Sequence, residues 1–251
     1  MKKSLLFVLS GFLILVLGLT DLAVAQSLSI DLGGTAGAAA GTGVTERAIQ
    51  LIALLTVLSL APSILVMVTS FTRIVVVLSI LRTAIGAGTA PPNTVMISLA
   101  LFLTAFIMAP TLKESYNAGV QPYTAGTIQL EEAFTRGAAP FKTFMLKHTR
   151  DKDLALFLDM TSKPRPATAA EVDIQVVIPA FMISELRRAF EIAFLLYLPF
   201  VVIDLVVASV LMAMGMMMLP PVAVSLPFKL IFFVLVDGWN LVAGSLIKGF
   251  L

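Results

Sequence analysis

Residues 192–213 read IAFLLYLPFVVIDLVVASVLMA, and the only charge in this apolar run is Asp204. A helix needs about 20 apolar residues to cross the roughly 30 Å of hydrocarbon in a bilayer, and this run is long enough. The whole chain is 59% hydrophobic and 13% charged, whereas soluble domains hold roughly 45–50% apolar and about 25% charged residues. The sequence therefore predicts an all-α, membrane-associated protein.

Other apolar stretches of similar length lie at residues 48–69, 94–112 and 227–247. Residues 74–85 are apolar as well, but they are too short to span a bilayer. Asn93 follows two prolines, so we expect it to be the N-cap of the second stretch. Pro220 and Pro221 separate the last two stretches, because proline interrupts helical hydrogen bonding. This order predicts two hydrophobic helical hairpins.

The N-terminus has the pattern of a cleavable signal peptide. Lys2 and Lys3 precede the apolar residues 5–19, and the small residues Ala23-Val24-Ala25 follow as a cleavage site. The mature chain would then begin at Gln26. The alternative is an uncleaved first transmembrane helix, which the short apolar region disfavours.

We divide the chain into five segments on these signals. They are the signal peptide at residues 1–25, a Gly/Ser/Thr-rich flexible tail at 26–45, a first hydrophobic hairpin at 46–112, a polar helical segment at 113–189, and a second hydrophobic hairpin with a methionine-rich loop at 190–251. A cleaved signal peptide leaves Gln26 in the periplasm, so residues 113–189 are expected there as well. Arg73 and Arg82 then lie in the cytoplasm, as the positive-inside rule prefers. Within the polar segment, residues 139–160 are expected to form one helix.

The composition gives no indication of a catalytic site or a metal site. The chain has no cysteine, a single histidine (His148) and a net charge of +2. No grouping of residues resembles a catalytic triad, a phosphate-binding loop or a metal site. We therefore predict no enzyme, no metal, no cofactor and no nucleic-acid partner.

A run of methionines precedes the two prolines and is the most unusual local feature. Its members are Met212, Met214, Met216, Met217 and Met218, beside Gly215. Methionine is flexible and polarizable, so it seals against irregular surfaces. Several copies meeting on one axis could close a passage with these side chains. Ordinary core or lipid-facing methionine is the alternative that the pattern leaves open.

Charges also occur inside the apolar stretches, at Asp204, Lys229 and Asp237. A charge at membrane depth costs on the order of 2.5–3.5 kcal/mol on insertion scales and usually marks function or pairing. We expect Asp204 and Asp237 to be buried charges, whereas Lys229 is close enough to an end to reach the interface.

Several segments together resemble one family. The matching motifs are TSFTRI at residues 69–74, APPN at 90–93, LALFLT at 99–104, DLV at 204–206, ASVLM at 208–212, LPFKL at 226–230 and LVDGW at 235–239. With them the chain resembles the FliP/SctR family of type III export gates, in its flagellar branch, over nearly all of residues 46–250. The equivalent subunit of a virulence injectisome is the alternative.

The resemblance implies a non-enzymatic pore subunit in the inner membrane, within the flagellar basal body. It implies a homopentamer that joins FliR and FliQ in a helical, cone-like ring of hairpins, with FlhB as a further partner and unfolded flagellar subunits as substrates. The implied methionine gasket is the run named above. Implied intersubunit ionic contacts are Arg150, Glu185 and Lys229, and implied pore-domain aromatics are Phe144 and Phe157. A solute transporter and a pore-less scaffold are rival functions.

Overall fold

The computed structural model describes residues 63–161, 166, 168, 171–216 and 218–250, together with residues 49, 51, 52, 55, 56, 59 and 60. The predicted signal peptide and tail, and much of the stretch at residues 48–69, lie outside this description, as does Met217. The chain divides into two units, Met1–Val57 and Leu58–Leu251. All the elements below belong to the second unit.

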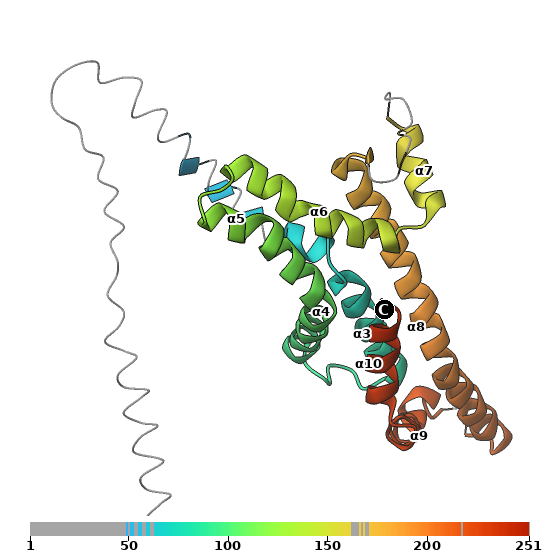
Figure 1. Cartoon of the computed structure of the whole chain (residues 1–251). Coiled ribbons are helices and arrows are strands. Elements are labelled where there is room, and N and C mark those ends of the chain that lie inside the picture. The colour runs from blue at the N-terminus through green and yellow to red at the C-terminus, as the bar shows by residue number, and fades with distance from the viewer. Residues whose placement is uncertain are drawn as a thin grey trace, which may run out of the picture. The chain divides into compact units, whose positions relative to one another are not determined.

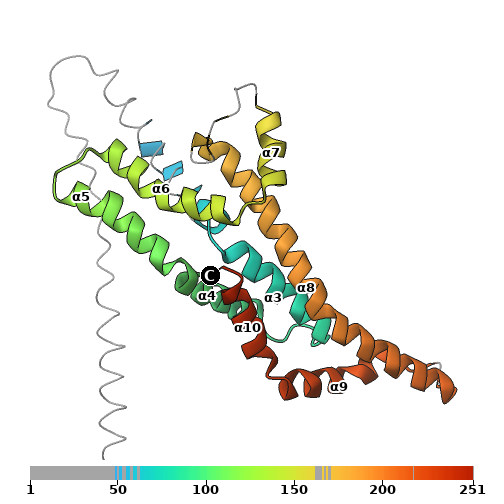
Figure 2. The same cartoon turned by 45° about the vertical axis from the view of Figure 1, so that its right-hand side comes forward.

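The secondary structure of the described residues is helical throughout, as predicted. The elements are α3 (Phe71–Ile85), α4 (Asn93–Ser115), the π-helix η1 (Tyr116–Val120), α5 (Gln121–Thr124), α6 (Leu130–His148), α7 (Asp151–Asp159), α8 (Ile174–Ala213), α9 (Pro221–Leu235) and α10 (Gly238–Lys248). In Figures 1 and 2, α3 lies along α8, and α6 runs beside the continuous helix formed by α4, η1 and α5.

Within the described residues, two helices are long and apolar enough to cross a membrane, namely Asn93–Thr124 and Ile174–Ala213. A third candidate is the pair α9 and α10, which are bent by 62° at their junction. The sequence analysis placed one continuous stretch at residues 227–247. The structure instead breaks it at Asp237, which adopts the left-handed conformation with φ 51°.

Several predicted helix limits were wrong, each for a local reason. Asn93 is the first helical residue rather than the cap; its side-chain oxygen accepts a hydrogen bond from Arg82 Nη1 at 2.5 Å instead. Residues 139–160 form parts of two helices, because Thr149 and Arg150 are extended. The segment limits at 112/113 and 189/190 fall inside α4 and α8, and the five-segment division stays a prediction.

Two apolar clusters form the core of the described chain. The larger joins α3, α4, α8, α9 and α10 and has Ile74, Leu78 and Leu246 at its centre. The smaller joins α6, α7 and the first turns of α8 around Met145, Val177 and Phe181. Phe144 borders both clusters, so the two are continuous. α3 is consequently enclosed, whereas the C-terminal part of α8 extends beyond the core.

Candidate functional site

The methionine run forms the connection between α8 and α9. α8 ends in a Schellman motif, in which the Gly215 N–H donates to the Met212 carbonyl at 3.0 Å and the Met216 N–H donates to the Leu211 carbonyl at 2.9 Å. Gly215 has φ 74°, a conformation that glycine adopts without steric cost. The backbone therefore leaves α8 in a defined way, and Pro221 begins α9.

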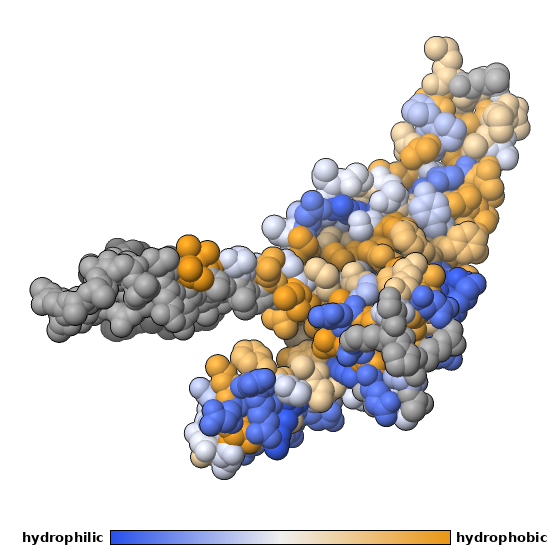
Figure 3. Space-filling model, turned by 90° about the horizontal axis from the view of Figure 1, so that it is seen from above, coloured by the Kyte–Doolittle hydropathy of each residue, from blue (hydrophilic) through white to orange (hydrophobic). Residues whose placement is uncertain are grey.

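The four methionine side chains that the structure describes in this run are exposed. Met212, Met214 and Met216 are exposed, and Met218 is 99% exposed. Figure 3 shows other hydrophobic residues at the surface beside hydrophilic patches. Clustered apolar side chains that a subunit leaves uncovered usually contact another protein or lipid. The arrangement can therefore supply a soft apolar contact, and it offers no group for acid–base or nucleophilic chemistry.

A buried polar network lies near the methionine connection and joins three helices. Lys229 Nζ donates to Asp204 Oδ2 at 2.6 Å and to the Ala84 carbonyl at 3.1 Å. Ser225 Oγ donates to Asp204 Oδ1 at 2.5 Å. Lys229 and Ser225 are buried, and Asp204 is partly exposed. Two of the three charges found in apolar stretches thus neutralise each other and fix α9 against α8 and α3.

Asp237 has a different environment from Asp204. It is exposed in the isolated subunit, at the bend between α9 and α10, and its Oδ2 accepts a hydrogen bond from Asn240 Nδ2 at 3.0 Å. Its neighbour Trp239 packs edge-on against Phe233, with ring centroids 5.2 Å apart. Burial of Asp237 against a second subunit remains a prediction.

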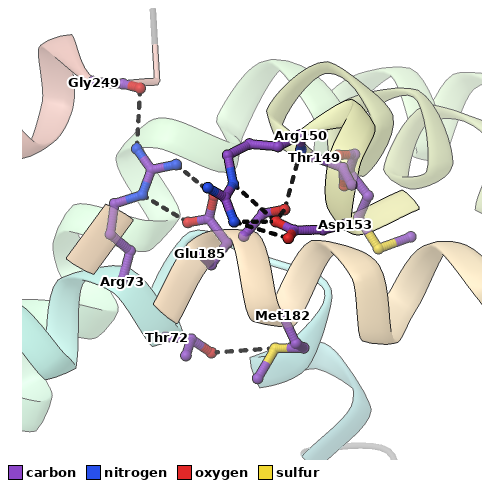
Figure 4. Close-up of polar contacts among 10 residues, drawn as sticks. Thr72, Arg73, Thr149, Arg150, Asp153, Met182, Glu185 and Gly249 are labelled. Atoms are coloured by element: carbon purple, nitrogen blue, oxygen red, sulfur yellow. Dashed lines mark hydrogen bonds and ion pairs between the residues drawn. The ribbon is translucent and has the colours of Figure 1, made fainter. Parts of the chain in front are cut away.

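Glu185 forms an ion pair inside the chain. Arg73 Nε donates to Glu185 Oε2 at 2.7 Å, and Arg73 Nη2 donates to Glu185 Oε1, so the pairing is bidentate. The two side chains are 1% and 0% exposed. Figure 4 shows Arg73 turned toward both Glu185 and the carbonyl of Gly249, to which Nη1 donates at 3.0 Å. Burial lowers the pKa of Arg73, and the Glu185 carboxylate opposes that shift.

Arg150 belongs to a second network, at the break between α6 and α7. Its Nε and Nη2 donate to the two oxygens of Asp153, each at 2.8 Å. Ser184 Oγ donates to Asp153 Oδ2 at 2.6 Å and accepts the Arg150 N–H at 3.1 Å. Burial alone would raise the pKa of Asp153, but the hydrogen bonds from Ser184 and Arg150 lower it overall. Arg150 itself is 27% exposed.

The two predicted aromatic residues lie on neighbouring helices, Phe144 on α6 and Phe157 on α7. Phe144 contacts His148, Phe181 and Phe250, with ring centroids 4.8, 6.0 and 5.9 Å away. Phe157 packs against the smaller core cluster. Both therefore support the fold of the subunit, and a role in the pore stays a prediction.

His148 is the buried neighbour of Phe144, and its Nε2 has no hydrogen-bond partner. Burial lowers its pKa to about 4, with further contributions from the charges of Arg73, Lys147 and Arg188. The ring is therefore neutral at pH 7. Among the described residues, no group of three or more His, Asp or Glu could hold a metal ion.

Sequence reasoning missed several partners of the residues that it singled out. It used Arg73 as a topology signal and as part of a family motif but assigned it no partner, and it gave no role to Asp153, Ser184, Ser225 or Phe250. A charge directly before an apolar segment was the available signal for Arg73. Asp153 lies among other charges in residues 150–153, so nothing local distinguishes it.

Comparison with known proteins agrees with the resemblance. The model of the FliP family matches residues 54–246. The chain is 62% identical to the flagellar biosynthetic protein FliP of Caulobacter vibrioides, over 91% of this chain and 84% of that protein. It is 49% identical to FliP of Rhizobium meliloti, over 96% and 98% of the two chains. FliP of Bacillus subtilis is 53% identical, over 80% of this chain and 91% of its own. By the family match and these identities, the chain belongs to the FliP family.

Proposed function

We propose that this protein is a core subunit of the flagellar type III export gate and that copies of it form the pore through which unfolded flagellar subunits cross the inner membrane. As a FliP-family member it is a non-enzymatic component of the flagellar export apparatus. The relatives named above are all flagellar proteins. They favour this branch over the virulence injectisome.

The observation that carries the proposal is the exposed methionine connection, residues 212–218, at the end of α8. Its backbone is fixed on one side by the Schellman motif. α9, on the other side, is held by the bonds from Lys229 and Ser225 to Asp204. A fixed backbone with flexible thioether side chains suits a seal that closes on irregular chains yet reopens. Met217 is proposed as part of the same seal from its sequence position.

We further propose that the seal forms where copies of the chain converge in a ring, as a homopentamer with FliR and FliQ and with FlhB nearby. The C-terminal part of α8 supports this, since Leu205, Val206 and Val210 are exposed apolar residues close to the methionines. In this arrangement the protein sits in the inner membrane within the basal body. Gln26 and residues 113–189 face the periplasm.

The three residues proposed for intersubunit ionic contacts have different positions in the subunit. Arg150 keeps part of its side chain exposed and can reach a carboxylate on a neighbour. Glu185 and Lys229 are buried and already paired within the chain. We therefore propose that Arg150 contacts the neighbour directly, while Glu185 and Lys229 support assembly by shaping the subunit. Phe144 and Phe157 are proposed to support the pore domain in the same indirect way.

The test replaces Met212, Met214, Met216, Met217 and Met218 together by alanine. Cells that produce the variant with FliR and FliQ should become permeable to ions and small solutes, while the complex still forms on a native gel. Met160→Ala is the matched control, because Met160 is equally exposed but distant in sequence. An intact complex without any leak would favour a pore-less scaffold and overturn the proposal.

A further inference from the structure

The last described residues of the chain are held in a socket formed by α3 and α6. The socket consists of Arg73, Phe144 and His148, and its occupants are Gly249 and Phe250. The Gly249 carbonyl accepts from Arg73 Nη1 at 3.0 Å, and the Arg73 guanidinium lies over the Phe250 ring, 3.6 Å from its centroid. The Phe250 ring stacks on Phe144 at 5.9 Å and meets His148 edge-on at 5.1 Å. Phe250 is thereby 5% exposed.

The chemistry of the socket is specific for arginine. A guanidinium has its N–H donors in a fixed fork and can also stack on an aromatic face. Arg73 uses Nε and Nη2 for Glu185 and Nη1 for Gly249, so a single side chain joins α3 to α8 and to the end of α10. A lysine at this position keeps the charge, but it has one nitrogen and cannot hold both partners with this geometry.

The socket is joined to the methionine connection through α10, the bend at Asp237 and Gly238, and α9. Phe250 follows α10, and α10 meets α9 at the tight bend of Asp237 and Gly238. A Cβ added to Gly238 would lie 2.2 Å from Phe233 Cε2, so the backbone and the ring are in direct contact there. α9 in turn carries Ser225 and Lys229, which hold Asp204 on α8. A continuous set of contacts therefore connects residues 249–250 with α9.

We propose that Arg73 is the positioning residue of the bent pair α9 and α10: by holding Gly249 and Phe250 in the socket, it fixes where the methionine connection lies. The inference rests on the proposed function only in its last step, the effect on the seal. The docking of α10 by Arg73 is measurable without any assumption about export.

The first experiment measures amide hydrogen exchange in the purified full-length chain. Phe250→Leu keeps an apolar side chain but loses the stacking on Arg73 and Phe144. Gly249→Ala has an allowed backbone at φ −69°, but its Cβ would lie 3.3 Å from Arg73 Nη1. Both variants should raise exchange in α10 by roughly tenfold through local opening, with α7 unchanged. Gly244→Ala is the control in the same helix, because its added Cβ meets no atom within 4 Å.

Arg73→Lys is the direct variant and should show the same local increase in α10. If it fails to fold, the two variants at 249 and 250 still decide the matter. Unchanged exchange in α10, or an equal rise over the whole chain, would overturn the positioning role.

The second experiment measures ion leak in cells, with the five-methionine alanine variant as reference. Gly249→Ala and Phe250→Leu should leak several-fold more than Gly244→Ala, although every methionine is present. If the five-methionine variant does not leak ions, the proposed function is contradicted, but the hydrogen-exchange result is unaffected. If the five-methionine variant leaks ions but Gly249→Ala and Phe250→Leu do not, only the link from the socket to the seal is contradicted.

Discussion

The two halves of α8 differ both in charge and in surroundings, because residues 174–193 carry four charged side chains and residues 194–213 carry only Asp204. Residues 174–193 contribute eight of the ten buried residues of the helix, among them Phe181, Ser184 and Glu185. Residues 194–213 contribute Phe200 and Leu211. A helix of this length extends about 60 Å, twice the roughly 30 Å of hydrocarbon in a bilayer. The first half is stabilised by its own chain, whereas the second half depends on neighbours or lipid for its cover.

The largest expected effect comes from breaking the buried pair in the first half. Glu185→Ala leaves Arg73 buried without its carboxylate, which typically costs about 3–5 kcal/mol. Thermal unfolding of the purified chain should show a loss of this size. Glu191→Ala is the control on the same helix, because the pair of Glu191 with Arg187 is exposed and worth roughly 0–1 kcal/mol. An equal loss of stability in Glu185→Ala and Glu191→Ala would show that the buried pair contributes no more than the exposed pair.

Charge reversal at Lys229 on α9, the partner of Asp204 in the second half of α8, should act on assembly. Lys229→Glu places a second carboxylate beside Asp204 and removes the bond to the Ala84 carbonyl. α9 should separate from α8, and the yield of the complex with FliR and FliQ on a native gel should fall by about tenfold or more. The double variant Asp204→Lys/Lys229→Glu should recover part of that yield. Normal assembly of Lys229→Glu would show that the contact between α8 and α9 is not needed.

His148, at the end of α6, should make the stability of the chain depend on pH. Its pKa is about 4 in the folded chain, below the ordinary value of 6.5. As the pH falls below about 6.5, the unfolded chain takes up the proton first, so stability is full above that pH and declines toward pH 4. Between pH 7 and pH 5 the loss should be about 2 kcal/mol.

The measurement for His148 is the free energy of unfolding across this pH range. His148→Gln is the control, because glutamine does not titrate and its stability should change less with pH. If the free energy of unfolding changes with pH in the same way in both proteins, groups other than His148 cause the pH dependence.

The smallest effect compares two serines of α8. Ser184 Oγ donates to the buried Asp153 carboxylate at 2.6 Å. Ser184→Ala should therefore lower the free energy of unfolding by about 1–3 kcal/mol, with about 1 kcal/mol as the typical value. Ser209 Oγ donates to the Leu205 carbonyl in its own helix and is exposed. Ser209→Ala should change stability by less than about 0.5 kcal/mol. A larger loss at Ser209 would mean that the second half is covered in the isolated subunit after all.

The sequence was sufficient for features that depend on local pattern. Continuous apolar runs identified the long helices, and the spacing of methionines with Gly215 and two prolines located the connection between α8 and α9. It failed where a local signal was missing. Thr149 and Arg150 end and begin helices without glycine or proline, so residues 139–160 had the periodicity of one helix. Conversely, Pro179 lies inside α8 without ending the helix.

Long-range pairs were beyond the sequence for a physical reason. Arg73 and Glu185 are 112 positions apart, and Arg73 and Gly249 are 176 apart. Their meeting depends on how α3 enters the core, which no single segment specifies. The charges at Asp204 and Lys229 were recognised as costly in an apolar setting, but their mutual bond needed the turn between α8 and α9 to be known.

The glycine stop at the end of α8 has a consequence for any assembly of identical copies. Because the Leu211 and Met212 carbonyls are already occupied by the turn, the helix can neither gain nor lose a residue at this end without breaking those bonds. In each copy, the methionine sulfur atoms therefore lie at the same distance along α8. Copies arranged around an axis would then each present the same methionines at the end of the same helix, so any closure that they form would be built from equivalent parts.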